Sequence, residues 1–325
     1  MSLSATYTTG VIAAKDKYLL KDKILRFAEM TAQEAFRALV ESGFGGGAEA
    51  AADVYSFETL IANEELSLDA FIREYAPSET DKAFLLAERD FHNAKALVKA
   101  KGLGVSAEKM LASEGLLALK TLETAVTEAD FSALSKYPEL QTACEAALQA
   151  FAEGNATGAQ IGAIFDKSLY AYLGRLTKFR PFLKKLLAKK ADMTNVLTAI
   201  RLVERENAEE KYLPCGTLSS EKLALLWQED TEAAAKAFAD TPYAPFVKKC
   251  LEAKSKGLPL TGAEKLRDGL EADYFAARKY ELKNSEPFLY YAYRRRVENA
   301  NVRIVFVGLL AGLSEREIKE RLRAF

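Results

Sequence analysis

Three pairs of polar residues with equal spacing are the strongest candidates for a functional site in this sequence. An acidic residue lies three positions before an asparagine in each pair: Asp90 and Asn93, Asp192 and Asn195, and Glu298 and Asn301. Residues three apart lie on one face of a helix, so each pair can hydrogen-bond a neighbouring helix end or a backbone carbonyl. We favour this structural role, because a motif repeated along a chain more often maintains a repeated unit than forms a site. The functional alternative is a ring of polar faces that lines a central opening.

Other residue types that perform chemistry are sparse or lack the spacing that chemistry requires. His92 is the only histidine, which excludes a histidine-rich zinc site, and Cys144, Cys215 and Cys250 lack metal-ligand spacing. The glycines within residues 43–47 are not followed by the Gly-Lys-Ser/Thr of a phosphate-binding loop, so we expect a flexible connector there. No carboxylate is set apart by its spacing. We therefore expect no catalytic residue, no cofactor and no metal site.

Basic residues are the candidates for contact with another protein. Six of them surround the start of the helix that carries the second pair: Lys178, Arg180, Lys184, Lys185, Lys189 and Lys190. Such runs are usually solvated faces, but clusters on repeated helices can also dock a charged protein surface. Five arginines on or beside the second and third helices are possible partner-binding residues: Arg201, Arg294, Arg295, Arg296 and Arg303.

The three pairs are carried by three similar stretches of sequence. The asparagines are separated by 102 and 106 residues, far longer than a solenoid repeat and about the size of a small domain. Two of the helices start alike, because the same Pro-Phe-Leu sequence begins fourteen residues before Asn195 and fourteen before Asn301, as Pro181-Phe182-Leu183 and Pro287-Phe288-Leu289. A serine in an N-cap context follows each pair, at Ser106, Ser219 and Ser314. These spacings indicate a triplication.

The two ends of the chain carry complementary parts of the repeated unit. Phe36-Arg37-Ala38-Leu39 resembles Phe131-Ser132-Ala133-Leu134, so the chain begins midway through one unit, and it ends midway through another. We expect the N-terminal segment to pack beside the C-terminal helix and to close a pseudo-threefold ring, which would leave no uncapped repeat. The expected division is an N-terminal helical segment that completes the third unit, followed by three repeats: 1–57, 58–155, 156–259 and 260–325.

Composition predicts a large all-α protein. The chain has 325 residues with 49% hydrophobic content, is rich in Leu, Ala, Glu and Lys, and shows helical periodicity without alternating strands. Residues 1–10 lack the features of a secretory signal, so we expect a cytoplasmic location. The longest apolar run, residues 304–313, is about half the length that spans a membrane. A formal charge of −1 gives no global reason to bind nucleic acid or an anionic membrane.

These motifs together resemble one family. The three pair-bearing helices look like the signature helices of the V-type ATPase C subunit, called the d subunit in eukaryotes. Three further segments are similar to that family: Pro214 to Leu218, Asp273 to Phe275, and Pro287 through Ser314 to Leu322. The likeness runs from roughly residue 60 to the end, whereas residues 7–15 lack the arginines that the family usually shows there.

The resemblance implies a funnel of three similar helical domains with no catalytic role. It implies a central-stalk subunit that couples the rotating shaft, formed by the D and F subunits, to the membrane rotor ring of proteolipid subunits for ion transport. Contact with the membrane, on its cytoplasmic face, would be through that ring alone, and nucleic acid would not be a partner. The competing interpretation is a helical-repeat adaptor that binds an extended peptide or nucleic acid in an open groove. A hydrolase, the third interpretation, would require a cluster of perturbed carboxylates in a cleft.

Overall fold

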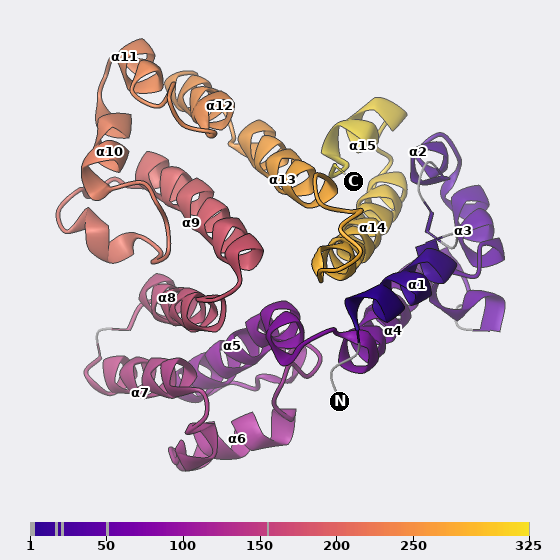
Figure 1. Cartoon of the computed structure of the whole chain (residues 1–325), viewed down its shortest axis with the longest axis horizontal. Helices are drawn as coiled ribbons and strands as arrows, with labels where there is room; N and C mark the ends of the chain where they lie inside the picture. The colour runs from indigo at the N-terminus through magenta and orange to yellow at the C-terminus, as the bar shows by residue number, and fades with distance from the viewer. Residues whose placement is uncertain (1–3, 17–18, 21–22, 50–51, 155, 325) are drawn as a thin grey trace. The chain divides into compact units, whose positions relative to one another are not determined.

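The computed structural model confirms the all-α fold class (Figure 1). It describes the chain except residues 1–3, 17–18, 21–22, 50–51, 155 and 325. The described residues form α-helices, short 3-10 helices and connecting loops, with no strand among them. They divide into two compact units: residues 1–82 with 264–325, here called the terminal unit, and residues 83–263, here called the central unit.

The terminal unit joins helices from both ends of the sequence. Its α-helices are α1 (Ala5–Asp16), α2 (Lys23–Phe27), α3 (Ala32–Glu41), α4 (Phe57–Tyr75), α13 (Thr261–Ala276, which begins in the central unit), α14 (Glu286–Leu310) and α15 (Glu315–Arg321). Figure 1 shows α2, α3 and α4 close to α14 and α15. Phe57 stacks on Phe306 with ring centroids 5.3 Å apart, and Ile24 and Ile318 are fully buried in the same core.

The structure places α4 in the terminal unit, whereas the sequence division placed it in the first repeat. The expected first repeat, 58–155, begins inside α4 and continues through the helix that bears Asp90. In the structure, Phe57, Leu60 and Ile61 of α4 are buried in the core formed with α14. The N-terminal segment of the terminal unit therefore extends to residue 82, beyond the expected boundary at residue 57. The division into three equivalent units stays a prediction.

The central unit contains the first two pair-bearing helices. Its α-helices are α5 (Glu79–Leu103, which begins in the terminal unit), α6 (Leu119–Glu128), α7 (Pro138–Ala152), α8 (Gly158–Leu176), α9 (Pro181–Arg201), α10 (Ser220–Ala224), α11 (Thr231–Lys236) and α12 (Ala244–Ser255). Residues of α5, α6, α7 and α8 form one core, in which the Phe91 and Tyr172 rings lie 5.8 Å apart.

Two of the three expected serine caps are present. Ser219 caps α10, and Ser314 forms a capping box with Glu317 at the start of α15. Ser106 does not cap a helix. A three-residue 3-10 helix, Glu108–Met110, follows with Ala107 at its N-cap, and the Glu108 N–H donates to the Ser106 hydroxyl at 3.3 Å.

The glycine stretch 43–47 is an ordered part of the terminal unit, not the flexible connector expected from sequence. Gly45, Gly46 and Gly47 have positive φ angles and interrupt a short 3-10 segment, Phe44–Glu49, that packs on α4. A Cβ atom added to Gly45 would lie 2.4 Å from the Leu60 carbonyl oxygen, so only glycine permits this approach. The Gly45 N–H donates to a Glu64 carboxylate oxygen at 2.8 Å. This amide therefore faces a negative group and is not available to a phosphate.

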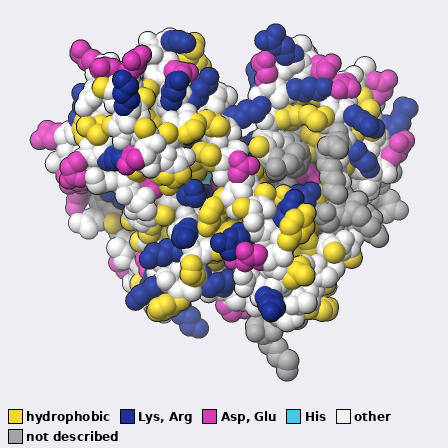
Figure 2. Space-filling model, turned by 45° about the horizontal axis from the view of Figure 1, so that its top comes forward, with side chains coloured by type: hydrophobic (Ala, Val, Ile, Leu, Met, Phe, Trp, Pro, Cys, Tyr) yellow, Lys and Arg dark blue, Asp and Glu magenta, His cyan; other side chains and the backbone are white. Residues whose placement is uncertain are grey.

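No described helix is both long enough and apolar enough to cross a membrane. On the face shown in Figure 2, side chains of both charges are interspersed with hydrophobic ones.

Candidate functional site

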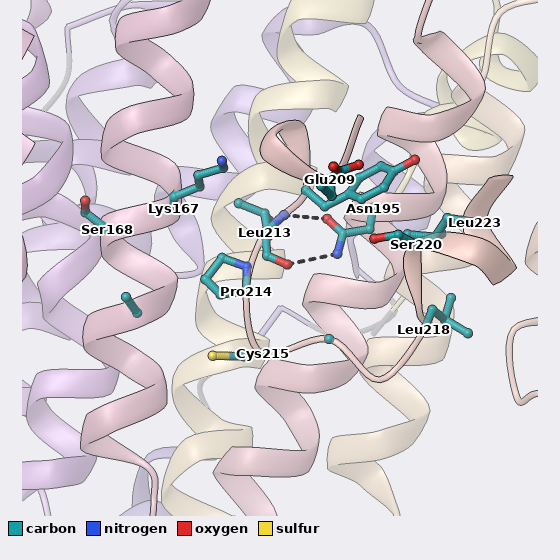
Figure 3. A pocket seen from close by; sticks show the side chains of 13 residues that line it. Lys167, Ser168, Asn195, Glu209, Leu213, Pro214, Cys215, Leu218, Ser220 and Leu223 are labelled. Atoms are coloured by element: carbon teal, nitrogen blue, oxygen red, sulfur yellow. Dashed lines mark hydrogen bonds between the residues drawn. The ribbon is translucent and has the colours of Figure 1, made fainter. Parts of the chain in front are cut away.

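Each asparagine of the three pairs binds the backbone of a loop through both atoms of its amide. In the central unit, Asn195 Oδ1 accepts the Leu213 N–H at 2.7 Å, and its Nδ2 donates to the Leu213 carbonyl at 3.0 Å (Figure 3). A side-chain amide presents the same donor and acceptor as a peptide group, so it can pair with a peptide unit twice. The same arrangement joins Asn93 to Ala112 (2.8 and 3.3 Å) and Asn301 to Arg323 (2.8 and 3.1 Å).

The first acid binds the next stretch of the same loop. Asp90 accepts the N–H groups of Leu116 at 2.7 Å and Leu117 at 3.1 Å. The loop that follows α5 is thus held at two adjacent points, by Asn93 and then by Asp90. An ionised carboxylate that accepts backbone N–H groups forms stronger hydrogen bonds than a neutral acceptor does.

Asp192 accepts hydrogen bonds from backbone groups and from two side chains. Its carboxylate accepts the N–H of Thr217 at 2.6 Å and of Leu218 at 2.9 Å, the Thr217 hydroxyl at 2.6 Å and the Tyr243 phenol at 2.9 Å. Burial, followed by the Asp192 charge, raises the pKa of Tyr243, which keeps the phenol protonated as a donor.

The third acid receives its backbone donor from the other end of the chain. Glu298 accepts the Leu20 N–H at 3.0 Å, across 278 residues of sequence. At Glu298 the N-terminal segment therefore occupies the place that the downstream loop occupies at Asp90 and Asp192.

The six paired side chains are buried, each with at most 3% of its surface exposed. A ring of polar side chains lining an opening would require solvent-facing carboxylates and amides, so the observed burial favours the structural role. We call the three arrangements the polar clamps. In each, a helix fixes a loop through side-chain hydrogen bonds that are shielded from water.

A cavity of about 510 Å³ lies beside the second clamp (Figure 3). Lys167, Pro214 and Cys215 line it together with the buried Tyr212. Burial raises the pKa of the Cys215 thiol, which disfavours a reactive thiolate. The described residues contain no cluster of His, Cys, Asp and Glu that could hold a metal ion.

Arg295 is an internal residue of the terminal unit. Its guanidinium donates to Glu298 at 2.7 Å and also binds Glu64, and its side chain is 12% exposed. Burial lowers the pKa of Arg295, while the Glu298 carboxylate opposes that effect. Because these contacts are inside the unit, we assign Arg295 to the third clamp and not to a partner surface.

The other expected arginines lie nearer the surface. Arg303 pairs with Glu58 at 2.9 Å, and Lys95, which also follows its asparagine by two positions, pairs with Asp166 at 3.1 Å. The Arg294 guanidinium lies 5.5 Å from the centre of the Tyr290 ring. Arg296 is half-buried, and Arg201 is exposed at the end of α9.

Two glycines belong to the clamps and were not recognised as such from sequence. Gly115 and Gly216 each precede the residues that donate to the acid, and a Cβ atom at either would lie within 2.6 Å of an Asp90 or Asp192 oxygen. Their common signal is a glycine 25 positions after Asp90 and 24 after Asp192.

We expect Gly115→Ala and Gly216→Ala each to lower the free energy of unfolding by about 1–3 kcal/mol, because the new methyl group displaces the carboxylate. Urea denaturation measures the change. Gly162→Ala is the matched control: this helical glycine has open space around its Cα, so alanine should stabilise by about 0.5–1 kcal/mol. Equal effects at all three positions would contradict the close packing at the clamps.

Comparison with known proteins identifies the family. The profile of the ATP synthase (C/AC39) subunit family matches residues 8–321. The chain belongs to this family. It is also 21% identical over 279 residues to the C subunit of the V-type sodium ATPase of Enterococcus hirae, a match that covers 82% of each chain. Membership in the V-type ATPase C subunit family confirms the resemblance that the three pairs indicated.

Proposed function

We propose that this chain is a noncatalytic central-stalk subunit of a rotary V-type ATPase. It couples the rotating shaft, formed by the D and F subunits, to the proteolipid rotor ring on the cytoplasmic face of the membrane. The observation that carries this proposal is the family match over residues 8–321.

The polar clamps suit a part that transmits torque. A subunit that couples a rotating shaft to a ring must resist twisting. Long helices joined only by exposed loops would move relative to one another under torque. Each clamp fixes a loop to a helix with buried hydrogen bonds, and buried polar networks that are fully paired increase rigidity. In the terminal unit, the same arrangement ties the N-terminal segment to α14 through Leu20 and Glu298.

Contact with the partners is assigned to the outer arginines. Arg201, Arg294, Arg296 and Arg303 are the stronger candidates for a protein interface, because the Arg295 side chain is only 12% exposed and pairs with Glu64 and Glu298 of its own unit. Charges at the rim of an interface mainly affect association rate and its salt dependence.

Copurification tests the proposal directly. A tagged chain isolated from native membranes should bring with it the ATP-hydrolysing subunits, the shaft subunits and the proteolipid subunit, identified by mass spectrometry. A tagged chain carrying Asp192→Leu, which disrupts a clamp, should recover less of them. Recovery of the wild-type chain without any ATPase subunit would contradict the proposal.

A further inference from the structure

The end of α8, the start of α9 and the loop between them are unusually basic for this chain. Residues 167–191 contain eight lysines and arginines and no aspartate or glutamate, although the whole chain has a formal charge of −1. We call residues 178–185, at the centre of this stretch, the basic tip.

An exposed aromatic ring lies within the basic tip. Phe179 is 85% exposed, and the Lys178 ammonium lies 5.4 Å from the centre of its ring. Lys184 and Lys185 are exposed in the second turn of α9. Within the described chain, Lys178, Lys184 and Lys185 form no ion pair with a carboxylate. These three lysines therefore present positive charge close to an exposed apolar group.

The residues of the basic tip also disfavour the start of helix α9. α9 begins with Arg180 at the N-cap position, makes no side-chain cap there and has no acidic residue in its first turn. Positive charge at a helix N-terminus opposes the helix dipole. A segment that breaks local folding rules without a structural gain is a candidate for function.

We propose that the basic tip binds the anionic headgroup region of a lipid membrane, with Phe179 inserted among the headgroups. Basic residues next to an anionic bilayer are attracted to it, and an aromatic side chain adds apolar burial. Direct lipid contact departs from the expectation that the chain meets the membrane through the rotor ring alone. The inference does not depend on the rotary assignment, but a chain that works beside a rotor ring would be held near such a surface.

Composition favours lipid over an acidic protein as the occupant. Protein interfaces are depleted in lysine and enriched in arginine, whereas three of the four cations of the tip are lysines. Lysine is a flexible point charge suited to a diffuse anionic surface, and arginine is the side chain suited to the two-pronged binding of a single carboxylate. Phe179 lies on a loop between two helices, and a side chain 85% exposed is available for insertion.

Vesicle sedimentation with the full chain tests the proposal. We expect binding to vesicles of equal parts phosphatidylcholine and phosphatidylglycerol, no binding to phosphatidylcholine alone, and weaker binding at high salt. The double variant Lys184→Gln, Lys185→Gln should bind about 30-fold more weakly, which corresponds to ~1 kcal/mol for each lysine. Phe179→Ser should weaken binding about fivefold or more.

Matched controls separate the tip from general charge and hydrophobicity. Lys248→Gln, Lys249→Gln removes the same charge from an exposed pair on α12, and Val203→Ser removes a 92% exposed apolar residue beyond the other end of α9. Both should bind anionic vesicles nearly as the wild type does. Circular dichroism checks that each variant is folded.

Two results would overturn the proposal. One is binding of the wild-type chain to anionic vesicles that is no stronger than its binding to neutral ones. The other is an equal loss of binding in the tip and control variants. If the wild-type chain binds no vesicles and the double-lysine variant loses its ATPase subunits on copurification, the tip is assigned to an acidic protein instead. Failure of the wild-type chain to copurify with those subunits is a separate result, and it would contradict the rotary assignment alone.

Discussion

Replacement of Asp192 with leucine is expected to lower the free energy of unfolding by roughly 3–5 kcal/mol. Leucine fills a similar space but accepts no hydrogen bond. Two backbone N–H groups, of Thr217 and Leu218, and the phenol of Tyr243 would lose their acceptor inside the protein. Each stranded buried donor costs about 1–3 kcal/mol. Urea denaturation followed by circular dichroism measures the loss.

An exposed carboxylate of the same unit provides the control. Asp166 pairs with Lys95 at 3.1 Å, but its side chain is 55% exposed. Water screens such a pair, so Asp166→Ala should change stability by less than about 1 kcal/mol. Similar losses for Asp192→Leu and Asp166→Ala would mean that the buried clamp contributes no more than a surface ion pair.

Arg295→Glu is expected to cost about 3–5 kcal/mol and to unfold the terminal unit first. The substitution removes the positive partner of Glu64 and Glu298 and places a third carboxylate beside them. Removal of one partner of a buried ion pair leaves uncompensated charge away from water, which is strongly destabilising. Hydrogen exchange measured by mass spectrometry should show loss of protection in α4 and α14, with less change in α9.

Arg316→Glu is the matched control for charge reversal. Arg316 lies in the same unit and pairs with Glu320, but its side chain is 87% exposed. Water screens this surface pair, so we expect little change in the free energy of unfolding. If Arg295→Glu changed the free energy of unfolding as little as Arg316→Glu and instead weakened copurification with the ATPase subunits, Arg295 would belong to the partner-binding surface.

The clamp side chains and the helices that carry them can be predicted from the sequence, because they depend on residue type and spacing. The separation of an acid and an asparagine by three positions predicted a shared helix face, and the recurrence of the pair identified the helices that carry it. The family resemblance rested on these same residues. Helical periodicity and turn signals were enough to predict the all-α fold.

The partners of the clamps could not be predicted, because they are backbone groups without a sequence signature. Nothing in the residue type of Leu213 or Leu20 indicates that its peptide unit meets Asn195 or Glu298. The ion pairs of Arg295 could not be predicted from sequence for a related reason. Its sequence neighbours are also arginines, and only the position of Glu64 on another helix shows that this one points inward.

Ion transport in native membranes lacking this chain tests the rotary-coupling assignment most directly. The measurement compares ATP-driven ion uptake and ATP hydrolysis in vesicles with and without the protein, with restoration by the purified wild-type chain. The account predicts that uptake is abolished while the detached head still hydrolyses ATP, because a part that only couples the shaft to the ring performs no chemistry. ATP-driven uptake that persists at the normal rate in vesicles without this chain would contradict it.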